Sequence, residues 1–175
     1  MTTTLDRPAA EARFRAVFSH LGAVAAYARR RGHADPEAIA AEVMAIAWRR
    51  LSNVPLDDPR PWLCGTARNL VLADARRRTT ATGQVEGSAP APEPIELDPE
   101  LGDALRSLSP TDREALLLVA WEDLTPTQAA RSLGIRPAAF RIRLLRARRR
   151  LQARLEEAAA EPAPEPKANL DMETT

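Results

Sequence analysis

Nine arginines and no acidic residue lie between residues 124 and 155 of this 175-residue chain, although its net charge is only +1. A guanidinium group binds phosphate oxygens and the edge of guanine, so a segment this basic suits a polyanion such as DNA. A solvated surface helix in an arginine-rich protein would also carry many arginines. The apolar residues among the arginines help to separate the two interpretations.

The stretch "RPAAFRIRLLRARRRLQARL", residues 136–155, fits a helix with two different faces. At about 100° per residue, Phe140, Leu144 and Leu151 fall on one stripe, which must face a core. Ile142 and Leu145 lie on the opposite side among arginines. Apolar side chains contact thymine methyl groups in the major groove, which favours a DNA-recognition helix. A protein-binding face is the alternative, since exposed apolar patches often mark interfaces.

Arg136 stands where the N-cap of this helix is expected. Ser, Thr, Asp or Asn is preferred at that position, typically by about 1 kcal/mol. A phosphate near the helix start would bind both the arginine and the free backbone amides. We therefore expect Arg136 to contact DNA.

The sequence offers little material for catalysis or metal binding. Cys64 is the only cysteine, and His20 and His33 are the only histidines. One cysteine forms neither an internal disulfide nor a thiolate metal cluster. We predict no enzyme activity, no metal and no cofactor. No apolar run has the length of a signal peptide core or a membrane span, so a cytoplasmic protein without membrane insertion is expected.

Two proline-containing segments divide the chain. Residues 80–99, "TATGQVEGSAPAPEPIELDP", are predicted to be a flexible linker, and residues 158–175 a disordered acidic tail. Neither segment buries enough apolar surface to offset the entropy of ordering. The rest, residues 1–79 and 100–157, is predicted to form two small helical domains, which makes the fold class all-α.

The first domain is predicted to contain three helices. One spans residues 11–32, and the next opens with Asp35 as N-cap and Pro36 at the first helical position. A third begins at Pro61. Apolar residues recur at helical spacing in all three, and Trp48 is expected in the core.

The second domain contains the pattern of a helix-turn-helix. Ser109 is predicted to cap one helix, and Thr125 with Gln128 is predicted to form a capping box on the next. That short helix ends at Gly134, and the basic helix follows after a tight turn. A short helix, a glycine-containing turn and a longer basic helix are typical of DNA-binding helix-turn-helix units.

Together these helices resemble an extracytoplasmic-function (ECF) sigma factor of bacterial RNA polymerase, within the sigma-70 family. "LSPTDREALLLVAWEDLTPTQAARSLGIRPAAFRIRLLRARRRL" is similar to the family's minus-35-reading domain, region 4. "DPEAIAAEVMAIAW" and "PWLCGTARNLVLADARRR" are similar to the polymerase-binding and minus-10-reading helices of region 2. The resemblance implies a protein that binds core RNA polymerase and directs promoter-specific initiation of transcription.

The resemblance also implies partners and contact residues. The partners are promoter DNA, the clamp of the polymerase's largest subunit and an anti-sigma factor. The residues for the minus-35 duplex are Thr127, Gln128, Arg136, Arg141, Ile142, Leu145, Arg146 and Arg149. The residues for the melted minus-10 strand are Arg68, Asn69, Arg76, Arg77 and Arg78, with Asn69 at the position that recognises an extruded base. The residues for the polymerase are Glu37, Ile39, Glu42, Val43, Ile46 and Arg49.

Three other classes of protein share parts of this pattern. A helix-turn-helix regulator would bind DNA without being a polymerase subunit. A helical adaptor would use Ile142 and Leu145 to bind protein. A recombinase or transposase fragment would need a carboxylate cluster, whereas the acids of the first domain are expected at helix caps and in loops.

Overall fold

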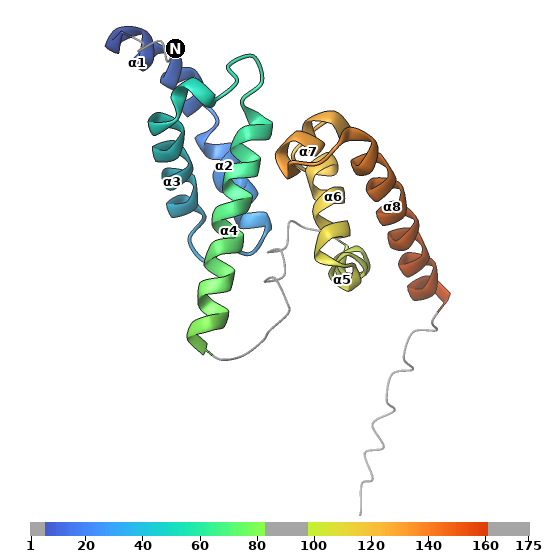
Figure 1. Cartoon of the computed structure of the whole chain (residues 1–175). Coiled ribbons are helices and arrows are strands. Elements are labelled where there is room, and N and C mark those ends of the chain that lie inside the picture. Colours follow the sequence, from blue (N-terminus) through green and yellow to red (C-terminus); the bar gives the residue numbers. More distant parts are fainter. Residues whose placement is uncertain (1–5, 83–97, 161–175) are drawn as a thin grey trace, which may run out of the picture.

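The structure, a computed structural model, describes residues 6–82 and 98–160, which form eight α-helices and one 3-10 helix (Figure 1). The N-terminal bundle consists of α1 (Arg7–Phe18), α2 (Leu21–Arg30), α3 (Pro36–Arg49), η1 (Leu51–Asn53) and α4 (Arg60–Thr82). The C-terminal bundle consists of α5 (Pro99–Ser107), α6 (Pro110–Ala120), α7 (Pro126–Leu133) and α8 (Pro137–Ala160). No strand occurs in the described residues, and the all-α prediction is confirmed.

The helices overrun the predicted domain boundaries slightly. Helix α4 continues to Thr82, past the predicted end at residue 79, and α8 continues to Ala160, past residue 157. Most of the predicted linker and tail, residues 83–97 and 161–175, lies outside the described residues.

One predicted helix is in fact two. The expected continuous helix over residues 11–32 is divided into α1 and α2 at Ser19 and His20. The Ser19 hydroxyl donates to the carbonyl oxygen of Ala16 at 2.7 Å, within the same turn. Such a side-chain bond competes with the helical backbone bonds and favours a helix end, a signal that apolar spacing alone does not reveal.

The predicted helix caps are confirmed. The Asp35 carboxylate accepts from the amide of Ala38 at 2.9 Å, with Pro36 at the first helical position. Thr125 and Gln128 form the reciprocal capping box: Thr125 Oγ1 accepts from the Gln128 amide at 3.3 Å, and Gln128 Oε1 accepts from the Thr125 amide at 2.7 Å. Gly134 ends α7 in the left-handed region, at φ +65°.

The prediction that Trp48 lies in the core is wrong, because 46 % of this residue is exposed. Val43, Met44 and Ala47 already fill the buried stripe of α3, and Trp48 lies about 100° past that stripe. Its ring packs edge-on against Phe14, with the ring centroids 5.1 Å apart.

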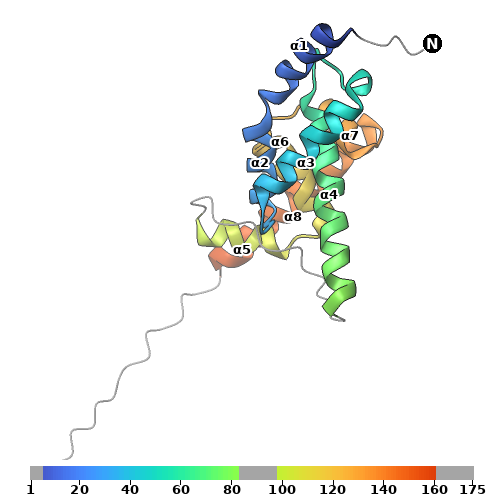
Figure 2. The ribbon, with the colours of Figure 1, turned by 90° about the vertical axis from the view of Figure 1, so that its left-hand side faces the viewer.

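The two bundles pack directly against each other (Figures 1 and 2). Helix α7 lies against α4, and the end of α2 faces α6. At the α4–α7 contact, a Cβ atom on Gly65 would lie only 2.7 Å from the carbonyl oxygen of Ser132. Glycine is therefore required there for the observed approach of the two backbones.

We expect Thr125→Ala to lower the free energy of unfolding by about 1 kcal/mol, because it removes the side-chain acceptor of the α7 capping box. Urea denaturation followed by circular dichroism measures this loss. Thr127→Ala, in the same turn but without a cap bond, is the matched control. Equal stability of the Thr125 and Thr127 variants would show that the box contributes nothing.

Candidate nucleic-acid interface

Helix α8 has the two faces that its sequence predicts. Phe140, Leu144 and Ala147 are buried in the core of the C-terminal bundle. On the other side, Ile142 is 53 % exposed and Leu145 is 50 % exposed. All four arginines predicted to contact the minus-35 duplex are also exposed: Arg136, Arg141, Arg146 and Arg149.

The arginines of α8 divide into paired and unpaired groups. Arg150 forms an ion pair with the buried carboxylate of Asp112 on α6, and Arg154 pairs with Glu157 at 2.9 Å. Arg141, Arg146 and Arg149 have no acidic partner within residues 6–82 and 98–160. Arg146 and Arg149 lie next to Ile142 and Leu145 on the helix and Arg141 lies at the flank, so unpaired positive charge surrounds the two exposed apolar side chains, as a DNA groove requires.

The two residues at the start of α7 that are predicted to contact DNA lie in different surroundings. Thr127 is exposed, whereas both the oxygen and the nitrogen of the Gln128 side-chain amide already form hydrogen bonds within the protein. Its Oε1 belongs to the capping box, and its Nε2 lies 3.2 Å from the carboxylate of Asp58. Arg131 pairs with the same carboxylate at 2.6 Å. Sequence patterns did not reveal this contact, because Asp58 lies in a loop of the other bundle.

The predicted minus-10 residues follow one another along α4. Asn69 is exposed and Arg68 is half-buried. Arg77 and Arg78 both lie near the carboxylate of Asp74, at 3.1 and 3.4 Å. The hydrogen bond from Arg77, with the charges of Arg78 and His33, lowers the pKa of Asp74. Asp74 thus orients Arg77 and Arg78, the two residues that follow Arg76 at the basic end of α4.

Asn69 borders a surface recess that helices of both bundles line. The N-terminal bundle contributes Arg49 and Trp62, and α7 contributes Arg131 and Ser132. One wall of the recess next to the predicted base-reading residue therefore belongs to the C-terminal bundle.

Two of the predicted polymerase contacts need correction. Ile39 and Val43 are buried in the core of the N-terminal bundle, because they lie on the stripe of α3 that packs inward. Ile46 is partly exposed, and Glu42 is exposed beside Arg49, with their side chains 3.2 Å apart. Glu37, also exposed, pairs with Arg29 at 2.6 Å. The exposed side of α3 is thus more polar than predicted.

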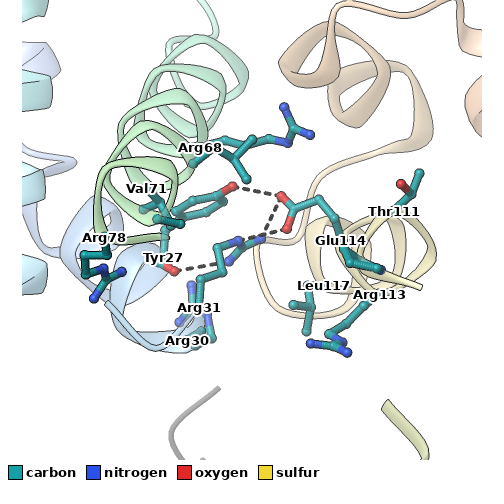
Figure 3. A pocket seen from close by; sticks show the side chains of 13 residues that line it. Tyr27, Arg30, Arg31, Arg68, Val71, Arg78, Thr111, Arg113, Glu114 and Leu117 are labelled. Carbon is teal, nitrogen blue, oxygen red and sulfur yellow. Dashed lines mark hydrogen bonds and ion pairs between the residues drawn. The ribbon is translucent and has the colours of Figure 1, made fainter. Parts of the chain in front are cut away.

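A buried group of charged residues joins the two bundles beside a cavity of about 130 Å³ (Figure 3). We call it the interbundle cluster; its members are Tyr27, Arg30, Arg31, Glu114 and Glu122. The Tyr27 hydroxyl donates to Glu114 at 2.8 Å, and the Arg31 guanidinium lies over the Tyr27 ring, 3.4 Å from its centroid. No sequence motif predicted this cluster.

The charges of the cluster are mutually stabilised. Burial raises the pKa of Tyr27, so its hydroxyl stays protonated and donates to Glu114. Burial opposes the charge of Arg31, but the carboxylates of Glu114 and Glu122 favour it, and the pKa of Arg31 is raised. Burial, together with Glu122, also raises the pKa of the nearby Cys64 thiol to about 12. That thiol is therefore neutral and a poor nucleophile.

Among the described residues, no group of three or more His, Cys, Asp or Glu side chains could hold a metal ion. In the same part of the chain, no helix combines the length and the apolar character of a membrane span.

Comparisons with known proteins place the C-terminal bundle in a family. Residues 99–151 match the family model described as "Sigma-70, region 4". Among curated proteins, none matches this sequence.

Two solved structures are similar over most of the chain. One is the sigma factor RpoE in complex with the anti-sigma factor NepR from Bartonella quintana. It matches with a TM-score of 0.60 and 24% identity, over 83% of this chain and 96% of that one. The other is CnrH in complex with the cytosolic domain of CnrY. It matches with a TM-score of 0.58 and 24% identity, over 84% of this chain and 89% of that one. Residues 99–151 of this protein are thus a sigma-70 region 4 domain, carried on a chain that has the fold of a sigma factor.

Proposed function

We propose that this protein is a sigma factor of the ECF type. It binds core RNA polymerase and directs initiation at promoters, where it reads duplex DNA at minus 35 and a melted strand at minus 10. The observation that carries this proposal is the exposed face of α8, where unpaired arginines surround two exposed apolar residues inside a sigma-70 region 4 domain. The protein contributes specificity and no catalytic step.

At the minus-35 element, α8 enters the major groove as the recognition helix. Arg141, Arg146 and Arg149 bind guanine edges or phosphates, and Ile142 and Leu145 contact thymine methyl groups. Arg136 binds a phosphate at the start of the helix, where free backbone amides add to its charge. Asp112, which borders this face, is buried and paired with Arg150, so it adds little repulsion of the phosphates.

At the minus-10 element, α4 captures the melted strand. The Asn69 amide has a donor and an acceptor, which suits the hydrogen-bonding edge of a base taken out of the stack. Arg68, Arg76, Arg77 and Arg78 provide a basic track for the strand. Capture of extruded bases favours the open duplex by shifting an existing equilibrium, so strand separation needs no catalytic residue.

The exposed side of α3 binds the clamp of the polymerase's largest subunit. Glu42, Ile46 and Arg49 carry this contact, whereas the buried Ile39 and Val43 support the helix from inside. Glu37 contributes less to the contact, because a carboxylate in the first turn also stabilises the helix N-terminus. An anti-sigma factor is the expected regulator, which is supported by the presence of the anti-sigma factor NepR in the similar RpoE structure.

Run-off transcription tests the function. Core bacterial RNA polymerase with this protein is expected to produce transcripts from genomic fragments that share paired upstream elements, and polymerase alone is not. Asn69→Ala should reduce those transcripts without weakening the binding of duplex DNA, since only the melted strand is read there. Duplex binding without any new transcript would instead identify a helix-turn-helix regulator that is not a polymerase subunit.

Arg146→Ala is expected to weaken binding of a minus-35 duplex. If Arg146 binds a base, the binding free energy is expected to weaken by about 1–3 kcal/mol. If it binds a phosphate, the slope of log binding constant against log salt concentration is expected to become shallower by about 0.9. Fluorescence anisotropy over a salt series measures both. Arg154→Ala is the matched control, because Arg154 pairs with Glu157 and lies on another side of α8. A similar effect of both substitutions would exclude a specific role for the proposed face.

Arg136→Ser should separate folding from DNA binding. Serine is a better N-cap, so the free energy of unfolding is expected to rise by about 1 kcal/mol. DNA affinity is expected to fall, because the phosphate loses its positive partner. Arg136→Ala, which removes the charge without adding a cap, should weaken DNA binding without that gain in stability. Unchanged DNA affinity in both variants would mean that Arg136 contacts no phosphate.

A further inference from the structure

The turn between α2 and α3 presents His33 to the side of α4 (Figure 1). Gly32 has φ +67°, in the left-handed region that favours glycine, and the backbone amide of His33 donates to the carbonyl oxygen of Ala28 at 3.1 Å. The backbone that carries the ring is therefore held by the end of α2. Only 9 % of the His33 side chain is exposed, so its ring nitrogens need partners within the protein.

Both ring nitrogens of His33 have such partners. Nε2 lies 3.1 Å from Oδ2 of Asp74 on α4, and Nε2 is the donor because an ionised carboxylate only accepts. Nδ1 lies 3.1 Å from the amide nitrogen of Asp35 and 3.0 Å from the carbonyl oxygen of the same residue. A neutral ring accepts from that amide, and a charged ring donates to that carbonyl oxygen. The bond to Asp74 therefore exists in either protonation state of His33.

Asp74 in turn contacts the basic end of α4, one helical turn further along. Its Oδ1 accepts from Arg77 at 3.1 Å, and its Oδ2 lies 3.4 Å from Nε of Arg78. Both arginines are exposed, and 75 % of the Arg77 side chain is exposed. Exposed ion pairs along a helix are weak and leave long side chains mobile. The bond from His33 restricts the rotation of the carboxylate, so each oxygen of Asp74 stays directed at its arginine.

The depth of His33 sets the direction in which it acts. A side chain this buried does not reach a nucleic acid, so its effect on DNA has to pass through Asp74 to the exposed arginines. The alternative is a purely structural role, in which the ring fills the space between the α2–α3 turn and α4. The two interpretations differ in what they require at this position, which is a hydrogen-bond donor in the first and bulk in the second.

We propose that His33 is a positioning residue for the melted minus-10 strand: its Nε2–H group fixes the Asp74 carboxylate, which holds Arg77 and Arg78 in the orientation that receives the phosphates of the strand. The strand-binding part of this inference rests on the proposed function. The ordering of the two arginines depends only on contacts within the chain.

Three substitutions of His33 separate the donor from the bulk. His33→Phe keeps a ring and removes both nitrogens. His33→Gln keeps an amide donor that reaches Asp74, whereas His33→Asn carries the same amide on a chain one carbon shorter, which is too short to reach. His20→Phe is the matched control, because His20 is the only other histidine and its side chain makes no cap bond to α2.

Nitrogen-15 relaxation of the full chain measures the ordering of Arg78, whose Nε faces Asp74. The motion of the Arg78 Nε–Hε group is expected to be restricted in the unsubstituted protein, in His33→Gln and in His20→Phe. It should become fast in His33→Phe and in His33→Asn. Equal motion in the Gln and Asn variants would overturn the positioning role, and this pair decides the matter even if His33→Phe does not fold.

The complex of this protein with core RNA polymerase tests the consequence for DNA. The probe is a fluorescent fork made from a promoter found by run-off transcription, with one minus-10 strand unpaired. The His33→Asn complex should bind the fork severalfold more weakly than the unsubstituted and His33→Gln complexes. The slope of log binding constant against log salt concentration should not change, because the arginines keep their charge. Arg78→Gln should instead make that slope shallower by about 0.7, the value for one phosphate of a single strand.

A double-mutant cycle shows whether the effect passes through Asp74. In a protein that carries Asp74→Ala, His33→Asn is expected to cause no further loss of fork binding. An equal further loss there, or unchanged fork binding in His33→Asn alone, would overturn the role in strand binding. If the unsubstituted complex binds the fork no better than core polymerase alone, the proposed function fails together with the strand-binding part, whereas the motion of Arg78 still decides whether His33 orders the arginines.

Discussion

The burial of Arg31 between the two bundles is the constraint on which the arrangement of this molecule depends. A guanidinium group stays charged at any pH the protein meets, so its burial requires acids at bonding distance. Glu114 and Glu122 meet that requirement, and both belong to the other bundle. The ring of Tyr27 covers the remaining face of the cation. The orientation of the bundles therefore follows from the need to neutralise one buried charge.

Charge pairing also explains how a chain with a net charge of +1 presents a strongly positive surface. Acids lie beside several of the arginines outside the exposed face of α8. Asp74 holds Arg77 and Arg78, Asp112 holds Arg150, and Asp58 holds Arg131. On α8, Arg141, Arg146 and Arg149 pair with no acid of the described residues, and Asp112, which borders this face, is itself paired with Arg150. The electrostatic field at the protein surface therefore depends on where the acids lie and not on the net charge.

The contact between α4 and α7 links the two proposed DNA-reading elements mechanically. Asn69 lies one helical turn after Gly65, and Gln128 lies one turn before Ser132. A change in the distance between α4 and α7 therefore alters the surroundings of both reading residues at once. The small side chains at this contact make the approach close enough for the recess beside Asn69 to be lined by both bundles.

The amino-acid sequence by itself determined the local features: the caps at Asp35 and Thr125, the left-handed turn at Gly134, the two-faced α8 and the family of residues 99–151. These depend on residues within a few positions of one another, so spacing and residue type suffice to predict them. Only the tertiary structure decided that Trp48 is exposed and that Ile39 and Val43 face inward. It also decided that the side chain of Gln128 donates a hydrogen bond to Asp58. It also decided that Arg31 meets Glu114 and Glu122. These outcomes depend on which face of a helix is covered by a distant segment, and residues more than 80 positions apart carry no local signal of the charge that they will meet.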